Sequence, residues 1–131
     1  MADRIRQRIS SGIMLPAVGQ GAVGVQCRSD DADTTTLLSP LDHPSTHARV
    51  RAERAANAYL GGGCHVPIGA FAEIKEGQLH LRGLVGRPDG SEVLFANAQG
   101  SVGDPEALGH ALADDLLSQG AAALLEEFAD A

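Results

Sequence analysis

A run of three glycines is the feature that most constrains how this chain of 131 residues can fold. Gly61–Gly63 follow a helical pattern and precede Cys64 and a short extended run that contains Pro67. Glycine adopts positive φ without strain, so such a run ends a helix and lets other groups approach the backbone closely. The thiol of Cys64 is therefore either buried in the core or presented to a ligand.

The segment before these glycines, residues 44–60, carries small side chains at helical spacing. Pro44 suits the first turn of a helix. The inner stripe comprises Ala48, Ala52, Ala55, Ala56, Tyr59 and Leu60. Arginines and Glu53 occupy much of the remaining surface. Such a stripe predicts close packing on a sheet or on another helix.

Three strands and two further helices are predicted after the glycines. Apolar side chains alternate with period two over residues 68–74, 79–85 and 93–97, and tight turns separate these segments. A helix over 104–120 begins with an aspartate cap, and residues 121–128 form another. The pattern predicts an α+β fold, in which a small three-stranded antiparallel sheet has helices on one face.

Residues 1–41 contain shorter elements. Residues 3–11 predict a short basic amphipathic helix, and alternating valines predict a strand over residues 20–28. A brief helix is predicted over residues 34–39. The first helix has no earlier element to pack on, so we expect the chain to begin within a larger architecture.

The balance of charge limits the classes of partner. The formal net charge is −7, whereas nucleic acids and anionic membranes attract basic surfaces. No apolar run approaches the length of a membrane span, and the first residues lack the apolar core of a secretory signal. Two cysteines give no disulfide framework and favour a reducing compartment. We expect a cytoplasmic protein that binds neither nucleic acid nor membranes.

Gly19-x-Gly21-x-x-Gly24 matches the dinucleotide-binding fingerprint letter for letter. That fingerprint works only when a strand precedes it and a helix begins at it. Here Pro16 precedes the motif and the predicted strand follows it, so the context is inverted. The glycines are better explained by close packing or by the close approach of a ligand.

The chemistry of Cys64 stays open on these grounds. Reactive thiols gain thiolate character from a helix N-terminus or a cationic neighbour, whereas Cys64 follows a helix C-terminus. In extended backbone His65 points to the opposite side, and the pair lacks the spacing of a zinc motif. An inert buried cysteine and a thiol that carries a covalently attached group are both compatible with the local sequence.

The remaining candidate residues carry weaker signals. Cys27 alternates like a core residue near a strand end. Arg28 is either a solvated charge or a partner for a ligand carboxylate. His43 and His47 lie one helical turn apart but lack a third ligand, so we predict no metal site. No residue of the chain is assigned a catalytic role.

Several specific motifs occur in order along the chain. They are LPAVGQGAVGVQCR at residues 15–28, Ala52-Glu53-Arg54, GGCHVPIG at residues 62–69 and LVGRPDG at residues 84–90. Together they resemble the C-terminal part of the porphobilinogen deaminases, also called hydroxymethylbilane synthases. The resemblance covers nearly the whole chain. The sequence departs from the family pattern at Gly61 and His65, on either side of the Gly-Gly-Cys motif.

The resemblance implies a transferase of porphyrin and haem biosynthesis. Enzymes of this family condense porphobilinogen, with loss of ammonia, into the linear tetrapyrrole hydroxymethylbilane. They do so on a dipyrromethane primer that is thioether-linked to a cysteine, and that cysteine corresponds to Cys64. Gln20, Arg28, Gly62 and Gly63 match positions in the cofactor cleft. The implied partners are porphobilinogen and the growing pyrrole chain.

The resemblance also implies a division of the chain. Residues 1–41 correspond to a remnant of the preceding domains, and residues 42–131 to the C-terminal cofactor-attachment domain. The catalytic aspartate of the family matches no position here, so we expect this chain alone to be inactive. Family members are mostly monomeric, whereas residues 1–40 in isolation are expected to be mobile or to drive self-association. The alternative is an inactive stand-alone binding or assembly domain with unmodified Cys64.

Overall fold

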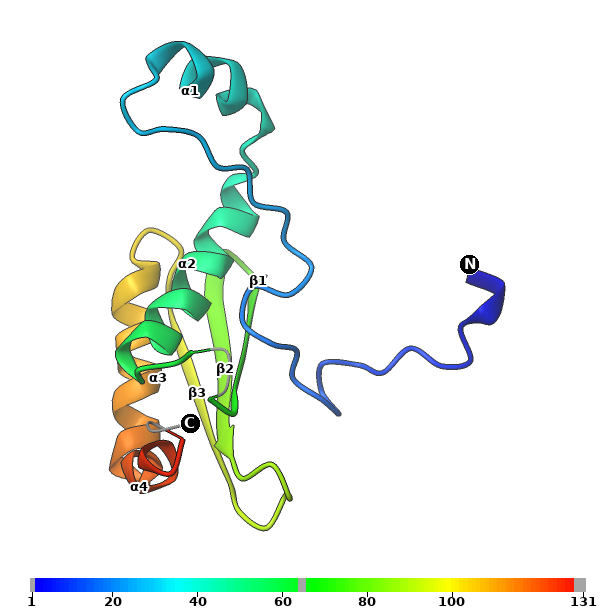
Figure 1. Ribbon diagram of the computed structural model, residues 1–131, viewed down its shortest axis with the longest axis vertical. Coiled ribbons are helices and arrows are strands. Elements are labelled where there is room, and N and C mark those ends of the chain that lie inside the picture. The colour runs from blue at the N-terminus through cyan, green and yellow to red at the C-terminus, as the bar shows by residue number, and fades with distance from the viewer. Residues whose placement is uncertain (1, 64–65, 129–131) are drawn as a thin grey trace.

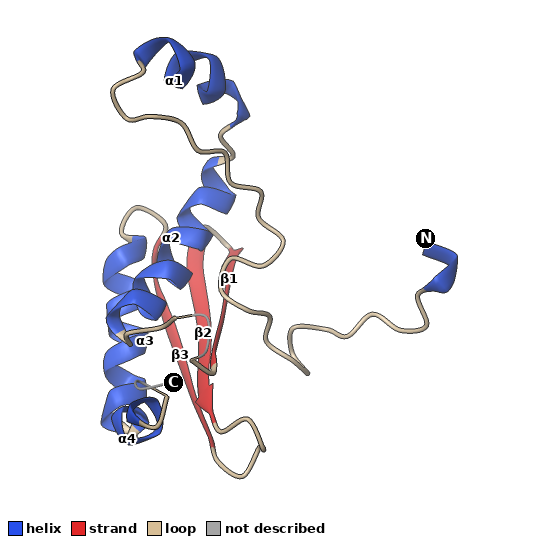
Figure 2. Cartoon of the chain, viewed as in Figure 1, coloured by secondary structure: helices blue, strands red, loops and turns tan. Residues whose placement is uncertain are grey.

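The computed structural model describes residues 2–63 and 66–128 of the chain. Cys64 and His65 lie outside the described residues. The elements are η1 (Ala2–Arg4), α1 (Ala32–Leu38), η2 (Ser39–Leu41), α2 (Pro44–Tyr59), β1 (Ile68–Lys75), β2 (Gln78–Gly86), β3 (Val93–Ser101), α3 (Pro105–Ser118) and α4 (Ala121–Glu126). Figure 2 shows that the helices and strands gather after residue 43, whereas most of the earlier chain is loop.

The three strands form one antiparallel sheet in the order β1-β2-β3. The register places Ala72 opposite Leu81, and Leu81 opposite Ala98. The β1–β2 turn has positive φ at both central residues, 52° at Glu76 and 77° at Gly77. This geometry matches the right-handed twist of a two-residue hairpin. The α+β fold predicted from the sequence is confirmed.

Helices α2 and α3 cover one face of the sheet (Figure 1). The fully buried side chains of this layer include Leu79, Leu81, Val85, Leu112 and Leu116. The two helices approach closely at a glycine, because a Cβ atom on Gly109 would lie 2.6 Å from the Ala52 carbonyl oxygen. The close packing predicted from the small-residue stripe of α2 is confirmed, but Tyr59, which the prediction placed in that stripe, is 49% exposed.

Helix α2 ends as the glycine run predicts. The amide of Gly61 donates to the Ala58 carbonyl at 3.1 Å, and the amide of Gly62 donates to the Asn57 carbonyl at 2.8 Å. Gly61 has a φ of 70°. This pair of bonds around a left-handed residue is a Schellman motif, and it satisfies carbonyls that the helix leaves free.

Two predictions for the N-terminal region are wrong. The helix over residues 3–11 is reduced to the single 3-10 turn of η1, and residues 20–28 form a loop rather than a strand. An amphipathic helix needs a surface for its apolar stripe, and Ile5 and Ile9 are about half exposed. A strand needs a neighbour to pair its backbone, and none lies beside residues 20–28 within the described part of the chain.

The brief helix expected over residues 34–39 does form, as α1. Asp31 caps it, because its Oδ1 accepts from the Thr34 amide at 3.0 Å. Figure 1 shows α1 beyond the N-terminal end of α2, apart from the sheet. None of its residues is buried. The division of the chain at residues 41 and 42 stays a prediction.

Residues 11–17 run past the face of the sheet that α2 and α3 leave open. Arg82 on β2 donates to the Ser11 carbonyl at 3.0 Å and to the Ser11 hydroxyl at 2.9 Å. A Cβ atom on Gly69 would lie 3.6 Å from the Cβ of Leu15, so the segment runs within ordinary contact distance of β1. In the described part of the chain, no helix is long and apolar enough to cross a membrane.

Candidate functional site

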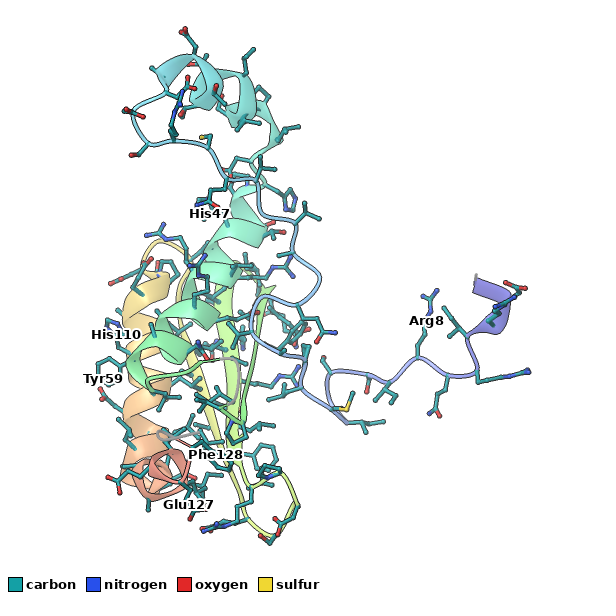
Figure 3. The ribbon with its side chains drawn as sticks, viewed as in Figure 1. Arg8, His47, Tyr59, His110, Glu127 and Phe128 are labelled. Atoms are coloured by element: carbon teal, nitrogen blue, oxygen red, sulfur yellow. The ribbon has the colours of Figure 1, made fainter. Side chains whose placement is uncertain are left out.

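A groove of about 1520 Å³ lies between α2 and the loop that precedes it in sequence. Its walls come from residues 17–27, from the outer side of α2, and from Gly62, Gly63 and Val66. Figure 3 shows His47, one of the lining residues, near the start of α2, and Arg8 on the N-terminal arm well away from the groove. The groove therefore joins segments that are far apart in sequence.

The α2 wall follows one face of the helix. His47, Arg51, Arg54 and Ala58 recur at intervals of three or four residues, which places them on one side. Ala48, Ala52 and Ala56 on the other side are buried against α3 and the sheet. The packing that fixes the fold therefore also presents this polar face to the groove.

The charges on the α2 wall are not equivalent. Arg51 forms a two-bond pair with Glu106, at 2.6 Å from Nε to Oε1 and 2.9 Å from Nη2 to Oε2. This pairing, chiefly the hydrogen bond from Arg51, lowers the pKa of the Glu106 carboxyl. Arg54 makes no hydrogen bond or ion pair within the part of the chain that the structure describes. Its guanidinium is therefore the groove cation that remains available to an anionic ligand.

The histidines of the groove are engaged in local contacts. His47 Nδ1 lies 3.0 Å from Asp42 Oδ1, and His43 Nδ1 lies 2.8 Å from the hydroxyl of Thr46. Among residues 2–63 and 66–128, no three His, Cys, Asp or Glu side chains are grouped so that they could hold a metal ion.

The loop of residues 17–22 forms the second wall and is folded into two consecutive turns. The Gln20 amide donates to the Ala17 carbonyl at 3.0 Å, and the Ala22 amide donates to the Gly19 carbonyl at 3.1 Å. Gly19 and Gly21 have φ values of 69° and 86°, which side chains with a Cβ rarely adopt. Two of the three glycines of the fingerprint-like motif, Gly19 and Gly21, therefore serve turn geometry.

Glu53 attaches this loop to the rest of the fold. Its Oε2 accepts from the Gly19 amide at 2.8 Å, and its Oε1 accepts from the Ala72 amide at 2.8 Å. Its side chain is buried, with 5% of the residue exposed. The sequence reasoning assigned Glu53 to the outer surface of the helix, which is wrong. Ala52 and Ala56, one residue before and three residues after Glu53, belong to the buried stripe. Their position on the helix is the sequence signal that could have predicted the burial of Glu53.

The base of the groove is formed by the described flanks of Cys64. The amide of Val66 donates to the Gly63 carbonyl at 3.2 Å, so the two flanks lie close together. A Cβ atom on Gly62 would lie 2.1 Å from Oδ1 of Asn57, so this position is closely packed against the end of α2. The structure thus brings Gly62 and Gly63 into the groove, while Cys64 itself lies outside the described residues.

The other predicted site residues lie at or beyond the margin of the groove. Gln20 belongs to the loop wall, but its Oε1 accepts from the Ala17 amide at 3.0 Å, and its neighbours Gly19 and Ala22 line the groove instead. Arg28 does not line the groove; its Nη2 lies 3.5 Å from Asp31 Oδ2, and its side chain is 82% exposed.

Cys27 differs from its expected environment. The sequence placed it in the core, whereas the structure leaves it exposed, with its Sγ 3.8 Å from the Thr35 hydroxyl. It lost its core position because the predicted strand that carried it does not form. Its side chain contributes to the lining of the groove.

Two family models match this chain. The porphobilinogen deaminase C-terminal domain matches residues 47–118, which include most of α2, the sheet and α3. The porphobilinogen deaminase dipyrromethane cofactor binding domain matches residues 1–36, which include the loop wall of the groove. The family is one of transferases, and its dipyrromethane cofactor gives the second domain its name. The chain belongs to the porphobilinogen deaminase family and is a C-terminal part of such a deaminase.

Proposed function

We propose that this chain is the cofactor-attachment part of a hydroxymethylbilane synthase, with Cys64 as the anchor of the dipyrromethane primer. The observation that carries the proposal is the position of the anchor's flanks. Gly62, Gly63 and Val66 line the same groove as the 17–22 loop. That loop belongs to the segment matched by the cofactor-binding model.

The proposed anchor works by forming a thioether. A bond forms between Cys64 Sγ and the aminomethyl carbon of porphobilinogen, and the C–N bond of that group breaks. Ammonia leaves with the thiol proton, so atoms and charge balance. A second porphobilinogen would then join the first ring through its own aminomethyl carbon, with loss of a second ammonia, to complete the primer. Cys64 would hold that primer, which would offer a ring carbon for the addition of further porphobilinogen. Formation of this thioether depends on space around the sulfur and on the departure of ammonia. It depends less on a permanently lowered pKa of the thiol.

The groove suits a group of this kind. Its volume of about 1520 Å³ exceeds that of a typical pocket for a small organic ligand, so two pyrrole rings can be accommodated. The rings carry carboxylate side chains, and the available guanidinium of Arg54 can bind one of them in the two-bond geometry that arginine favours. Gln20 and Arg28 remain proposed cleft residues. Each must leave its present hydrogen bond or ion pair to contact the cofactor.

We also propose that the chain divides into parts of different domains. Residues 1–41 belong to the preceding domains, and residues 42–131 form the attachment domain; separate family matches on either side of residue 41 support this. The resemblance gives the catalytic aspartate of the family no counterpart among these 131 residues. The chain alone is therefore expected to hold the primer without turning over porphobilinogen. The proposed setting is cytoplasmic haem biosynthesis, with porphobilinogen and the growing pyrrole chain as partners.

The intact mass of the protein tests this proposal. Protein purified from cells that make porphobilinogen should exceed its sequence mass by two porphobilinogen units less two ammonia molecules. The variant Cys64→Ser should lack this addition. An unmodified wild-type protein would contradict the proposal and favour the stand-alone binding domain. Steady consumption of porphobilinogen by the chain alone would overturn the expected lack of turnover.

A further inference from the structure

Glu53 is a charged residue that is buried in the fold. Within residues 2–63 and 66–128, no other charged or polar residue is buried to this degree. Burial of a carboxylate is costly unless its oxygens are hydrogen-bonded. Both oxygens of Glu53 are satisfied by backbone amides, each at 2.8 Å. The cost of burial is therefore offset by bonds that only a group with two acceptor oxygens can make together.

The two amides belong to segments that have no direct hydrogen bond to each other. Ala72 lies on β1, an edge strand whose other side pairs with β2. Gly19 lies in the 17–22 loop, whose other hydrogen bonds among the described residues are internal to it. Val18 adds an apolar contact with the core. Glu53 is therefore the polar connection between this loop and the folded α/β unit.

We propose that Glu53 is a positioning residue, whose carboxylate fixes the 17–22 loop against β1 and so sets the width of the groove. The inference rests on the proposed function, because it treats the groove as the cofactor site. The loop wall and the flanks of Cys64 then keep a constant separation while the anchor is loaded. Loss of the carboxylate frees the loop, widens the groove and slows loading, whereas the core stays folded.

The variant Glu53→Gln tests this mechanism. The glutamine side chain has the same size but carries one acceptor oxygen and one NH₂ group. One of the two backbone N–H groups therefore loses its acceptor and faces another donor. Hydrogen exchange of the full chain should then accelerate about tenfold at the amides of Gly19 or Ala72. The amides of Leu81 and Leu112 should exchange as in wild type. Unchanged exchange at both Gly19 and Ala72 would overturn the proposal.

Two control variants separate positioning from stability. Glu92→Gln removes an exposed carboxylate whose partner is Arg87, in the turn between β2 and β3, and should leave exchange and loading unchanged. Val85→Ala truncates a fully buried core residue outside the groove and should lower stability without slowing the addition of mass at Cys64. Glu53→Gln should slow that addition about tenfold. Loading at the wild-type rate in Glu53→Gln, despite a released loop, would overturn the positioning role.

Wild-type protein supplies a measurement that needs no variant. The Gly19 amide should be protected from exchange although it lies in a loop, whereas the amide of Val23, in the unpaired segment, should exchange freely. An unprotected Gly19 amide would overturn the proposal even if Glu53→Gln does not fold. Absence of any added mass on wild type would refute the proposed function alone, because the exchange pattern at Gly19 and Ala72 is read without the cofactor.

Discussion

The predicted strand over residues 20–28 and the strand β2 carry the same alternation of apolar side chains, yet only β2 forms a strand and buries them. In β2, Val85 is fully buried, with 0% exposed, because its strand is paired on both sides with β1 and β3 and helices cover its face of the sheet. In the N-terminal region, Val25 is 61% exposed and Val23 is 94% exposed. Alternation determines which residues can share a face, whereas pairing with neighbouring strands and a covering layer of helices determine whether that face is buried.

The largest expected effect is in the centre of the sheet. Leu81 is fully buried, so Leu81→Ala should lower the free energy of unfolding by about 2–5 kcal/mol, through lost burial and a residual cavity. Val23→Ala removes apolar surface from an exposed residue and should change the free energy of unfolding by less than about 0.5 kcal/mol. Urea unfolding monitored by circular dichroism gives both values. Similar losses for the two variants would break the contrast between the regions.

A glycine in each region gives a comparison of intermediate size. Gly109→Ala places a Cβ atom 2.6 Å from the Ala52 carbonyl oxygen, which is backbone and cannot move aside easily. We expect a net loss of about 1–3 kcal/mol, because overpacking outweighs the better helix propensity of alanine. Gly24→Ala meets nothing within 4 Å. Its unfolding free energy should match that of wild type within about 0.5 kcal/mol. A more stable Gly109→Ala protein would show that α2 and α3 have room to separate.

The smallest effect concerns α1 and its cap. The hydrogen bond from the Thr34 amide is the main cause that holds the pKa of Asp31 below its usual value of 3.8. The ionised carboxylate therefore stabilises the helix above the unfolded-state pKa, and this contribution is lost as the pH falls through the folded-state pKa. Acidification should melt α1 before the sheet, seen as early loss of protection at the α1 amides by NMR. A titration of Asp31 at or above 3.8 would contradict the cap.

Most elements after residue 43 could be predicted because local and tertiary signals agree there. The end of α2 depends on Gly61 and Gly62, the first hairpin on Gly77, and the start of α3 on the cap of Asp104, whose carboxylate accepts from the Ala107 amide. Each of these signals acts within a few residues. The pattern of small residues on α2 further indicated a close neighbour, although it did not distinguish a helix from a sheet.

The errors occurred where the decisive contact is distant in sequence. The strand over residues 20–28 needed a partner strand, and Cys27 lost its predicted burial with it. Glu53 bonds to amides that lie 34 and 19 residues away, and no local pattern specifies such partners. The groove is likewise assembled from segments on both sides of α2. The motif around Cys64 led to the proposal of that residue as the anchor, but it did not predict the residues that form the groove beside it.

The chain contains one cysteine in each region, and the identity of the modified thiol tests the central claim most directly. Protein from cells that make porphobilinogen should be digested and mapped by tandem mass spectrometry. The account predicts a dipyrromethane adduct on the peptide that contains Cys64 and an unmodified peptide that contains Cys27, with the same result in the variant Cys27→Ser. An adduct on Cys27, or none on either cysteine, would contradict the assignment of Cys64 as the anchor.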